Sequence, residues 1–158
     1  MNQAMTLALR HLLRDQTVAA LGTLHESEPS VSMVPFALLP KAAGFVIHVS
    51  DLASHTGDMR AHKGVSLLVV APESAGVPPQ ARARITVRGS AKEAPRSSAE
   101  HENARSAYLA RFPETEGLFN LADFSLFCVE PSSVRFVAGF AQAATLTPES
   151  FASALREA

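Results

Sequence analysis

The sequence predicts an α+β fold, in which a small antiparallel β-barrel or strongly bent sheet carries peripheral helices. Three observations lead to this prediction. The length of 158 residues fits one domain, spanning residues 1–158. Hydrophobic residues make up 47% of the chain and charged residues 18%, which is enough apolar material for a core and argues against disorder. The local patterns run in the order helix, several strands, inserted helix, more strands and terminal helix.

The first half of the chain predicts a helix followed by a series of short strands. Met5, Leu9 and Leu12 form an apolar stripe at helical spacing within the first fourteen residues. Two apolar runs around a polar turn then predict a hairpin, and Pro35 places an edge or a bulge in its second strand. Gly64 is placed to end the helix of this half. The expected elements are strand 17–24, turn 25–29, strand 30–39, turn 40–44, strand 44–50, helix 52–62 and strand 65–71.

The second half begins with a Pro- and Gly-rich loop, 72–79, and a strand, 81–88, in which polar and apolar residues alternate. Its polar face carries Arg82, Arg84, Thr86 and Arg88. A helix over 96–111 is predicted to start at Ser97 or Ser98, with Glu100 placed for a capping box with Ser97. Strands 124–130 and 133–140 are expected to be interrupted or bent at Pro131. Thr147 and Pro148 open a terminal helix.

Composition excludes several classes of function. The net charge of -1 and the pI of about 6.6 give no global field for binding nucleic acid or an acidic membrane. Cys128 is the only cysteine, so no intrachain disulfide forms, and a reducing, cytoplasmic location is expected. Arg10, His11 and Arg14 interrupt the first apolar stretch, so no signal-peptide core is expected, and no apolar run is long enough to cross a bilayer.

One candidate anion site follows the strand that ends at residue 50. Ser50, Ser54, His55 and Thr56 surround a predicted helix start, where free backbone N–H groups and a partial positive charge favour phosphate. Serine and threonine are also ordinary caps, and on local grounds capping is the favoured interpretation. The arginine face of strand 81–88 is either a solvated surface or, if it faces this turn, the second half of a phosphate cradle.

No self-sufficient catalytic group stands out, so the catalytic residues are unknown at this stage. His55 and His62 are spaced by seven rather than the four residues of a helical zinc pair, and we expect no metal site. Cys128 lies in an apolar run and is expected to be a buried structural thiol. The pattern suits either a protein whose bound cofactor carries the chemistry or a binding protein without a reaction.

Several segments, taken in order, resemble the pyridoxamine-5′-phosphate-oxidase-like flavoproteins, and within them the haem-utilisation branch. The resemblance spans about residues 15–145. It rests on 20–24 (ALGTL), 29–36 (PSVSMVPF), 46–56 (VIHVSDLASHT), 81–86 (ARARIT), 123–127 (DFSLF) and 135–140 (RFVAGF).

This resemblance implies a split β-barrel of antiparallel Greek-key type that forms a homodimer and binds FMN at the subunit interface. Strand backbone around residues 32–35 and 49–50 would line the flavin. His55 and Thr56 would reach the phosphate or ribityl chain, and the two arginines would add charge within one chain or across the dimer. The implied cofactor-binding residues are Ser32, Met33, Val34, Pro35, Val49, Ser50, His55, Thr56, Arg82 and Arg84.

The chain also departs from the family pattern. It has no tryptophan and lacks the terminal substrate motif of pyridoxamine phosphate oxidases. Haem-degrading relatives use a histidine in a C-terminal segment, whereas no histidine follows His101 in this chain. The leading hypothesis is an FMN-dependent oxidoreductase acting on an unassigned small molecule with a small-molecule electron donor. The alternatives are a haem- or tetrapyrrole-handling protein and a non-enzymatic flavin-binding protein. Nucleic-acid binding through Arg82, Arg84 and Arg88 is the least favoured, because the charge balance is acidic and the chain has a single Tyr and no Trp to stack on bases.

Overall fold

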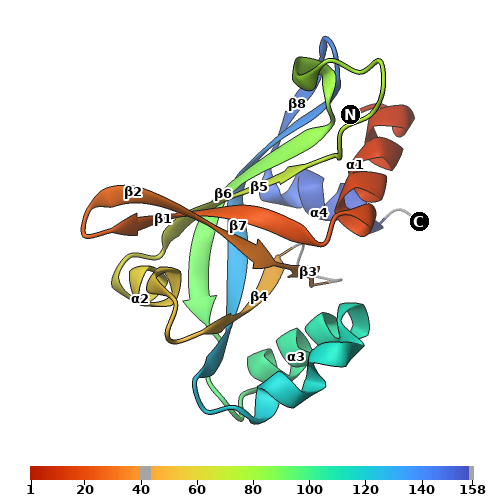
Figure 1. Cartoon of the computed structure of the whole chain (residues 1–158). Coiled ribbons are helices and arrows are strands. Elements are labelled where there is room, and N and C mark those ends of the chain that lie inside the picture. Colours follow the sequence, from red (N-terminus) through yellow and green to blue (C-terminus); the bar gives the residue numbers. More distant parts are fainter. Residues whose placement is uncertain (40–43, 157–158) are drawn as a thin grey trace.

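The computed structural model describes residues 1–39 and 44–156, so the predicted turn at 40–44 lies outside the described residues apart from Gly44. Figure 1 shows long curled strands with helices at the periphery. In chain order the elements are α1 (Gln3–Asp15), β1 (Val18–His25), β2 (Glu28–Pro35), β3 (Ala37–Leu38), β4 (Phe45–Ser50), α2 (Ser54–Ala61), β5 (Gly64–Val70), the 3-10 turn η1 (Pro79–Ala81), β6 (Arg84–Glu93), α3 (Ala99–Arg111), the 3-10 segment η2 (Pro113–Asn120), β7 (Phe124–Gly139), β8 (Gln142–Leu146) and α4 (Pro148–Arg156).

Within the described residues the strands form one eight-stranded antiparallel sheet. The order across it is β2-β1-β5-β6-β7-β4-β3, and β8 pairs with β7. The long strands β6 and β7 run through its centre, and the β1–β2 hairpin projects to one side next to α2 (Figure 1). The sheet curls into a half-barrel with peripheral helices, which confirms the predicted fold class.

The main core fills the concave side of this sheet. Its largest fully buried side chains are aromatic: Phe36, Phe45, Phe127, Phe136 and Phe151. Helices α1 and α4 cover it side by side, and the predicted stripe of Met5, Leu9 and Leu12 is buried there. The guanidinium of Arg10 donates from Nε to the carbonyl of Ala154 at 2.7 Å, which ties the two helices together.

A second, smaller core lies under α3. Ala104 and Tyr108 of this helix pack against Ala37, Val46 and Leu126 of the sheet. At the carboxyl end of α3, the Arg111 guanidinium donates to the carbonyls of Leu13 and Arg14 at 2.9 and 3.1 Å, and also to that of Gln16. One arginine therefore joins α3 to the end of α1.

The predicted strand boundaries differ from the structure where local geometry intervenes. The basic strand begins at Arg84 instead of residue 81, because the chain first makes the turn η1, and Arg82 precedes the strand. It also continues to Glu93. Pro131 does not interrupt β7: Gly89 pairs with Pro131 while Arg88 pairs with Ser133, so a bulge absorbs the proline. A Cβ on Gly89 would lie 2.3 Å from the Glu130 carbonyl oxygen, so only glycine allows this approach.

Helix starts and short elements account for the other differences. Helix α2 begins at Ser54, two residues later than expected, because residues 51–53 form the preceding turn. Helix α3 is capped by Ser98, whose Oγ accepts from the His101 N–H at 3.0 Å. Ser97 has φ +67° and makes no capping box with Glu100. The expected strand 30–39 divides into β2 and β3, and η2 and β8 were not predicted.

Candidate functional site

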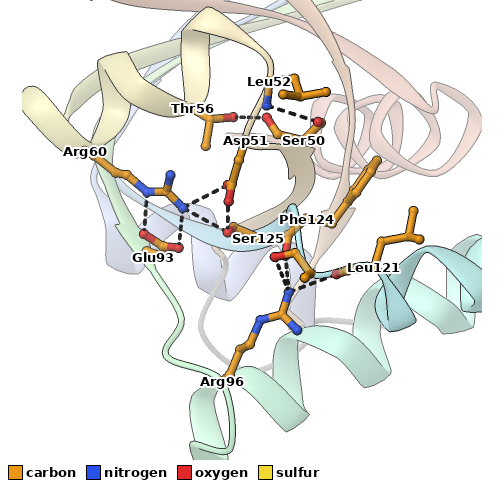
Figure 2. Close-up of polar contacts among 11 residues, drawn as sticks. Ser50, Asp51, Leu52, Thr56, Arg60, Glu93, Arg96, Leu121, Phe124 and Ser125 are labelled. Carbon is orange, nitrogen blue, oxygen red and sulfur yellow. Dashed lines mark hydrogen bonds and ion pairs between the residues drawn. The ribbon is translucent and has the colours of Figure 1, made fainter.

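The hydroxyls of the predicted phosphate seat are used by the turn itself. Ser50 Oγ accepts from the Leu52 N–H at 3.2 Å, and Thr56 Oγ1 donates to the Ser50 carbonyl at 2.7 Å (Figure 2). Thr56 is fully buried. Helix α2 itself has Ala53 as its N-cap and no side-chain cap. The side chains of Ser50 and Thr56 therefore hydrogen-bond within their own loop, and neither caps α2, so the capping interpretation is wrong as well.

The two arginines lie at the other end of the sheet. Arg84 pairs with Val137, whereas Ser50 pairs with Phe124, and these partners stand at opposite ends of the 16-residue strand β7. Arg82 donates through Nε to the Ala71 carbonyl at 3.0 Å, and Arg84 donates to the Gln80 carbonyl at 3.0 Å. The hypothesis of a cradle within one chain is wrong, because the arginines pin the 71–84 loop far from the turn.

The remaining predicted residues of β2 and β4 divide between the exposed and the buried face of the sheet. Met33 is 64% exposed on the outer face, whereas Val34 and the β4 residue Val49 are buried in the core. Pro35 is half-buried at the end of the edge strand β2. Ser32 lies on the inner face, where its hydroxyl meets His55 Nδ1 at 3.0 Å. The structure thus brings together Ser32 and His55 from the predicted set.

A pair of side chains that the sequence reasoning missed lies beside this contact. Asp58 of α2 is only 6% exposed and accepts a hydrogen bond from Thr23 Oγ1 at 2.9 Å. Its other oxygen lies 2.7 Å from His25 Nδ1, at the end of β1. Burial raises the pKa of Asp58, but the bonds from His25 and Thr23 outweigh it and hold that pKa below its usual value. The hydrogen bond and charge of Asp58 raise the pKa of His25.

No sequence pattern indicated this pair. His25 and Asp58 are 33 residues apart, and only the docking of α2 on β1 brings them together. His25 stood in the predicted polar turn, and Asp58 stood in a predicted helix without a partner. Three of the four residues at helical spacing from Asp58 are polar (Ser54, His55 and His62), so the helix shows no apolar face that would have marked the acid as buried.

An ion-pair network missed in the same way lies on the other side of α2. Arg60 donates to both carboxylate oxygens of Glu93, at 2.8 and 2.7 Å, and to Asp51 at 2.9 Å (Figure 2). These residues border a pocket of about 450 Å³ that Arg96 and His101 also line. Arg96 Nη2 donates to the carbonyls of Leu121, Ala122 and Phe124. The cations here are matched by acids or carbonyls, which makes the network structural.

His48 lies behind this pocket in an aromatic box. Its ring stacks on Phe119 with a centroid separation of 3.9 Å and meets Tyr108 edge-on. Nδ1 is buried without a hydrogen-bond partner among the described residues. Burial, reinforced by His101 and Arg96, lowers the pKa of His48 to about 4. The ring is therefore neutral at physiological pH and enclosed by aromatic side chains.

A second cleft, of about 760 Å³, separates α3 from strands β6 and β7, and Cys128 is among its lining residues. The thiol is half-buried at the edge of this cleft, not fully buried as expected, and burial raises its pKa, so it stays protonated. Over residues 1–39 and 44–156, no three His, Cys, Asp or Glu side chains are grouped so as to hold a metal ion. Within the same residues, no helix is long and apolar enough to span a membrane.

A curled antiparallel half-barrel with helices at its rim, and with polar groups gathered between its hairpin and α2, defines a split-barrel protein. The chain belongs to the pyridoxamine 5′-phosphate oxidase family, whose model matches residues 5–138. It falls in the haem-utilisation branch of that superfamily, as the resemblance indicated.

Three comparisons illustrate this placement. The chain is 35% identical over 139 residues to the chloroplastic heme oxygenase HOZ of Arabidopsis thaliana, covering 85% of this chain and 40% of that protein. It is 31% identical over 135 residues to the heme oxygenase HutZ of Vibrio cholerae, covering 85% of this chain and 73% of HutZ. A solved heme binding protein of Mycobacterium smegmatis superposes with a TM-score of 0.84 at 29% identity, covering 97% of this chain and 62% of that one.

These names correct one expectation. The relatives are called heme oxygenases and a heme binding protein, so they point to haem and contradict FMN as the expected cofactor. The finding favours the haem-handling alternative over the flavin-dependent hypothesis. The chain spans less than two thirds of the plant relative and of the mycobacterial protein.

Proposed function

We propose that this protein binds haem. The support from comparison is its similarity to two proteins named heme oxygenase and to a solved heme binding protein. The structural observation that carries the proposal is a pair of histidines between the β1–β2 hairpin and α2. His25 and His55 both have Nδ1 engaged, by Asp58 and by Ser32, and no hydrogen bond within the described residues engages Nε2 of either ring.

The two histidines supply one thing that the group needs, a ligand atom. Histidine is one of the side chains that ligate haem iron, and a histidine whose Nδ1 is held elsewhere offers Nε2 for that role. Leu52, three residues before His55 in the turn that leads into α2, is an apolar side chain that is 87% exposed. When bound, haem supplies an iron centre that activates oxygen, while this chain's histidines bind and orient it.

Haem titration tests the proposal directly. Difference absorption in the Soret region, with protein at micromolar concentration, is expected to show saturable 1:1 binding with a Kd of about 10 µM or tighter, equivalent to about 7 kcal/mol. The same chain unfolded in urea is the control for nonspecific uptake. A non-saturable change, or one equal to that of the unfolded chain, would rule haem binding out.

A second candidate function, oxidative opening of the haem ring, is favoured by the names of the two relatives that are called heme oxygenases. It requires dioxygen and an added reductant such as ascorbate. Decay of the Soret band together with released iron, trapped by a chelator, is the expected outcome. A Soret band that persists under these conditions would limit the protein to haem binding.

We also propose a homodimer formed through the outer face of the β1–β2–β5 sheet. Val18, Val31, Met33 and Leu68 are exposed there, from 38% to 74%. A patch of large apolar side chains on one sheet face is typical of a protein interface. Light scattering is expected to give twice the chain mass for the protein and the mass of one chain for Met33→Lys. A monomeric parent protein would exclude this interface.

A further inference from the structure

The pocket of about 450 Å³ beside α2 has no role in the proposed haem binding, which uses histidines on the other side of that helix. Its lining comes from α2, the segment that follows β6, the start of α3 and the start of β7. A volume of this size is typical of a site for a small molecule. Because the lining combines charged and apolar side chains, the pocket is able to select a ligand by both properties.

The two arginines of this pocket differ in how their charges are balanced (Figure 2). Arg60 is held by carboxylates, since it donates to both oxygens of Glu93 and to Asp51. Arg96 donates from Nη2 to three backbone carbonyls, at 2.8, 3.0 and 3.1 Å. Among the described residues, no carboxylate lies within 4 Å of its guanidinium, and its Nε and Nη1 make no hydrogen bond. Carbonyls hold a guanidinium in place without neutralising it, so Arg96 keeps a positive charge and further donors beside the pocket.

Two histidines lie at the Arg96 end of the pocket. His101 lines it, and its Nδ1 is buried without a hydrogen-bond partner in the part of the chain that the structure describes. Glu102 lies 3.7 Å from this atom, but its side chain is 68% exposed, so solvent weakens the pair. His48 packs against Phe124 with ring centroids 5.1 Å apart, and burial, then His101 and Arg96, lower the pKa of His48. These basic groups lie close enough to interact, which gives the pocket a positive end that a bound anion would balance.

The rest of the lining is largely apolar. An inorganic anion such as phosphate would use the positive end and leave the apolar side chains without contact. A molecule that carries one carboxylate on an apolar body would use both. We propose that this pocket binds a small apolar monocarboxylate, whose carboxylate accepts hydrogen bonds from Arg96. The apolar lining residues are Ala94, Pro95, Ala122, Phe124 and Leu126.

The simpler alternative is that Arg96 only anchors the turn that leads into β7. That role uses Nη2 alone, because all three bonds to carbonyls come from this atom. It explains neither the open volume beside the guanidinium nor the apolar lining. A carboxylate ligand accounts for both features.

Isothermal titration calorimetry with sodium benzoate at pH 7.5 tests the proposal, since benzoate carries one carboxylate on an apolar ring. Saturable 1:1 binding with a Kd of about 1 mM or tighter is expected. Benzamide has the same shape without the charge, and inorganic phosphate has charge without the apolar body. Each should bind at least about tenfold more weakly than benzoate. Absence of saturable benzoate binding, or equal binding of benzamide or phosphate, would overturn the proposed ligand class.

Ala122→Asp and Ala122→Asn form a matched pair of variants. Ala122 is exposed in the turn before β7 and lines the pocket, so both side chains are expected to leave the fold intact, as urea unfolding would report. Its carbonyl accepts from Arg96 at 3.1 Å, which places a new carboxylate near the guanidinium. The aspartate would balance that charge and repel benzoate, so Ala122→Asp should bind it at least about tenfold more weakly than Ala122→Asn. Equal affinity of the two variants would contradict the proposal. Arg96 itself is retained, because its bonds to carbonyls support the fold.

Proton NMR spectroscopy locates the bound ligand. On saturation with benzoate, the ring resonances of Phe124 and His101 are expected to shift, whereas those of His25 and His55 should not. Shifts confined to His25 and His55 would place benzoate on the other side of α2 and overturn the assignment of the pocket. None of these measurements contains haem, so their outcome is independent of the proposed haem binding.

Discussion

Acid is expected to destabilise this protein through the buried imidazole of His48. The folded state holds its pKa at about 4, whereas an unfolded chain has the ordinary value of about 6.5. Between these values the unfolded chain binds the proton and the folded chain does not. Stability therefore falls as the pH drops through this window, and the effect is absent above about pH 7.

The magnitude follows from the width of this window. A full shift of about 2.5 units corresponds to about 3.4 kcal/mol, of which about 2.5 kcal/mol is reached at pH 4.5. Water in the adjacent pocket screens part of the charge, which reduces the expected loss to about 1.5–2.5 kcal/mol. The groups that face His48, namely His101 and Arg96, disfavour its protonated form and add no compensating negative charge.

Urea unfolding at pH 7.5 and pH 4.5 measures the effect, with His48→Phe as the variant. Phenylalanine keeps the stacking on Phe119 but has no proton to bind, and the His48 Nδ1 atom has no hydrogen bond to lose. On acidification, the free energy of unfolding of the parent protein is expected to fall by about 1.5–2.5 kcal/mol more than that of the variant. Equal losses in both proteins would show that His48 is protonated normally in the folded state and would refute the reasoning.

Three further outcomes are expected in urea unfolding at pH 7.5. Arg111→Ala should lower the free energy of unfolding by about 2–3 kcal/mol, because it leaves the carbonyls at the end of α1 without their donor. Arg88→Ala, exposed on β6, is the control. Equal effects of the two substitutions would contradict the role of Arg111 in joining α3 to α1. Phe151→Ala should lower the free energy of unfolding by about 3–5 kcal/mol, because it opens a cavity under α4. A decrease below about 1 kcal/mol would show that α4 does not unfold together with the rest of the protein. Gly89→Ala should destabilise the sheet, since its Cβ would meet the Glu130 carbonyl, whereas Gly117→Ala, with open space around it, should not.

The periodic parts of the fold were predictable from sequence, and the reasons lie in local physics. The alternation of Ile85 and Val87 with polar neighbours predicted a half-buried strand, and both residues are buried. The apolar stripe of α1 was equally visible. An irregularity at Pro131 was predictable from the proline itself, but the register of the bulge was not, because it depends on a glycine of the neighbouring strand. The choice of Ser98 over Ser97 depends on one backbone angle.

The candidate site was predictable only where its residues are neighbours in the chain. The turn at residues 50–56 was recognised as hydroxyl-rich, but its hydroxyls bond to their own loop. The arginines looked compatible with the same site because sequence does not report which end of a strand faces which turn. The Asp58–His25 contact joins α2 to β1 across 33 residues, so only the packed structure brings it into view.

The separate core under α3 bears on how the molecule opens in solution. Tyr108 and its neighbours pack apart from the main core, and the helix is anchored mainly by Arg111 at one end and by Arg96 just before the other. Units with their own small core unfold and refold locally while the rest of the protein stays native. We expect amide hydrogens of α3 to exchange with solvent deuterium earlier than those of β6 and β7. Because α3 is one wall of the larger cleft, the width of that cleft would then fluctuate on the timescale of this local opening.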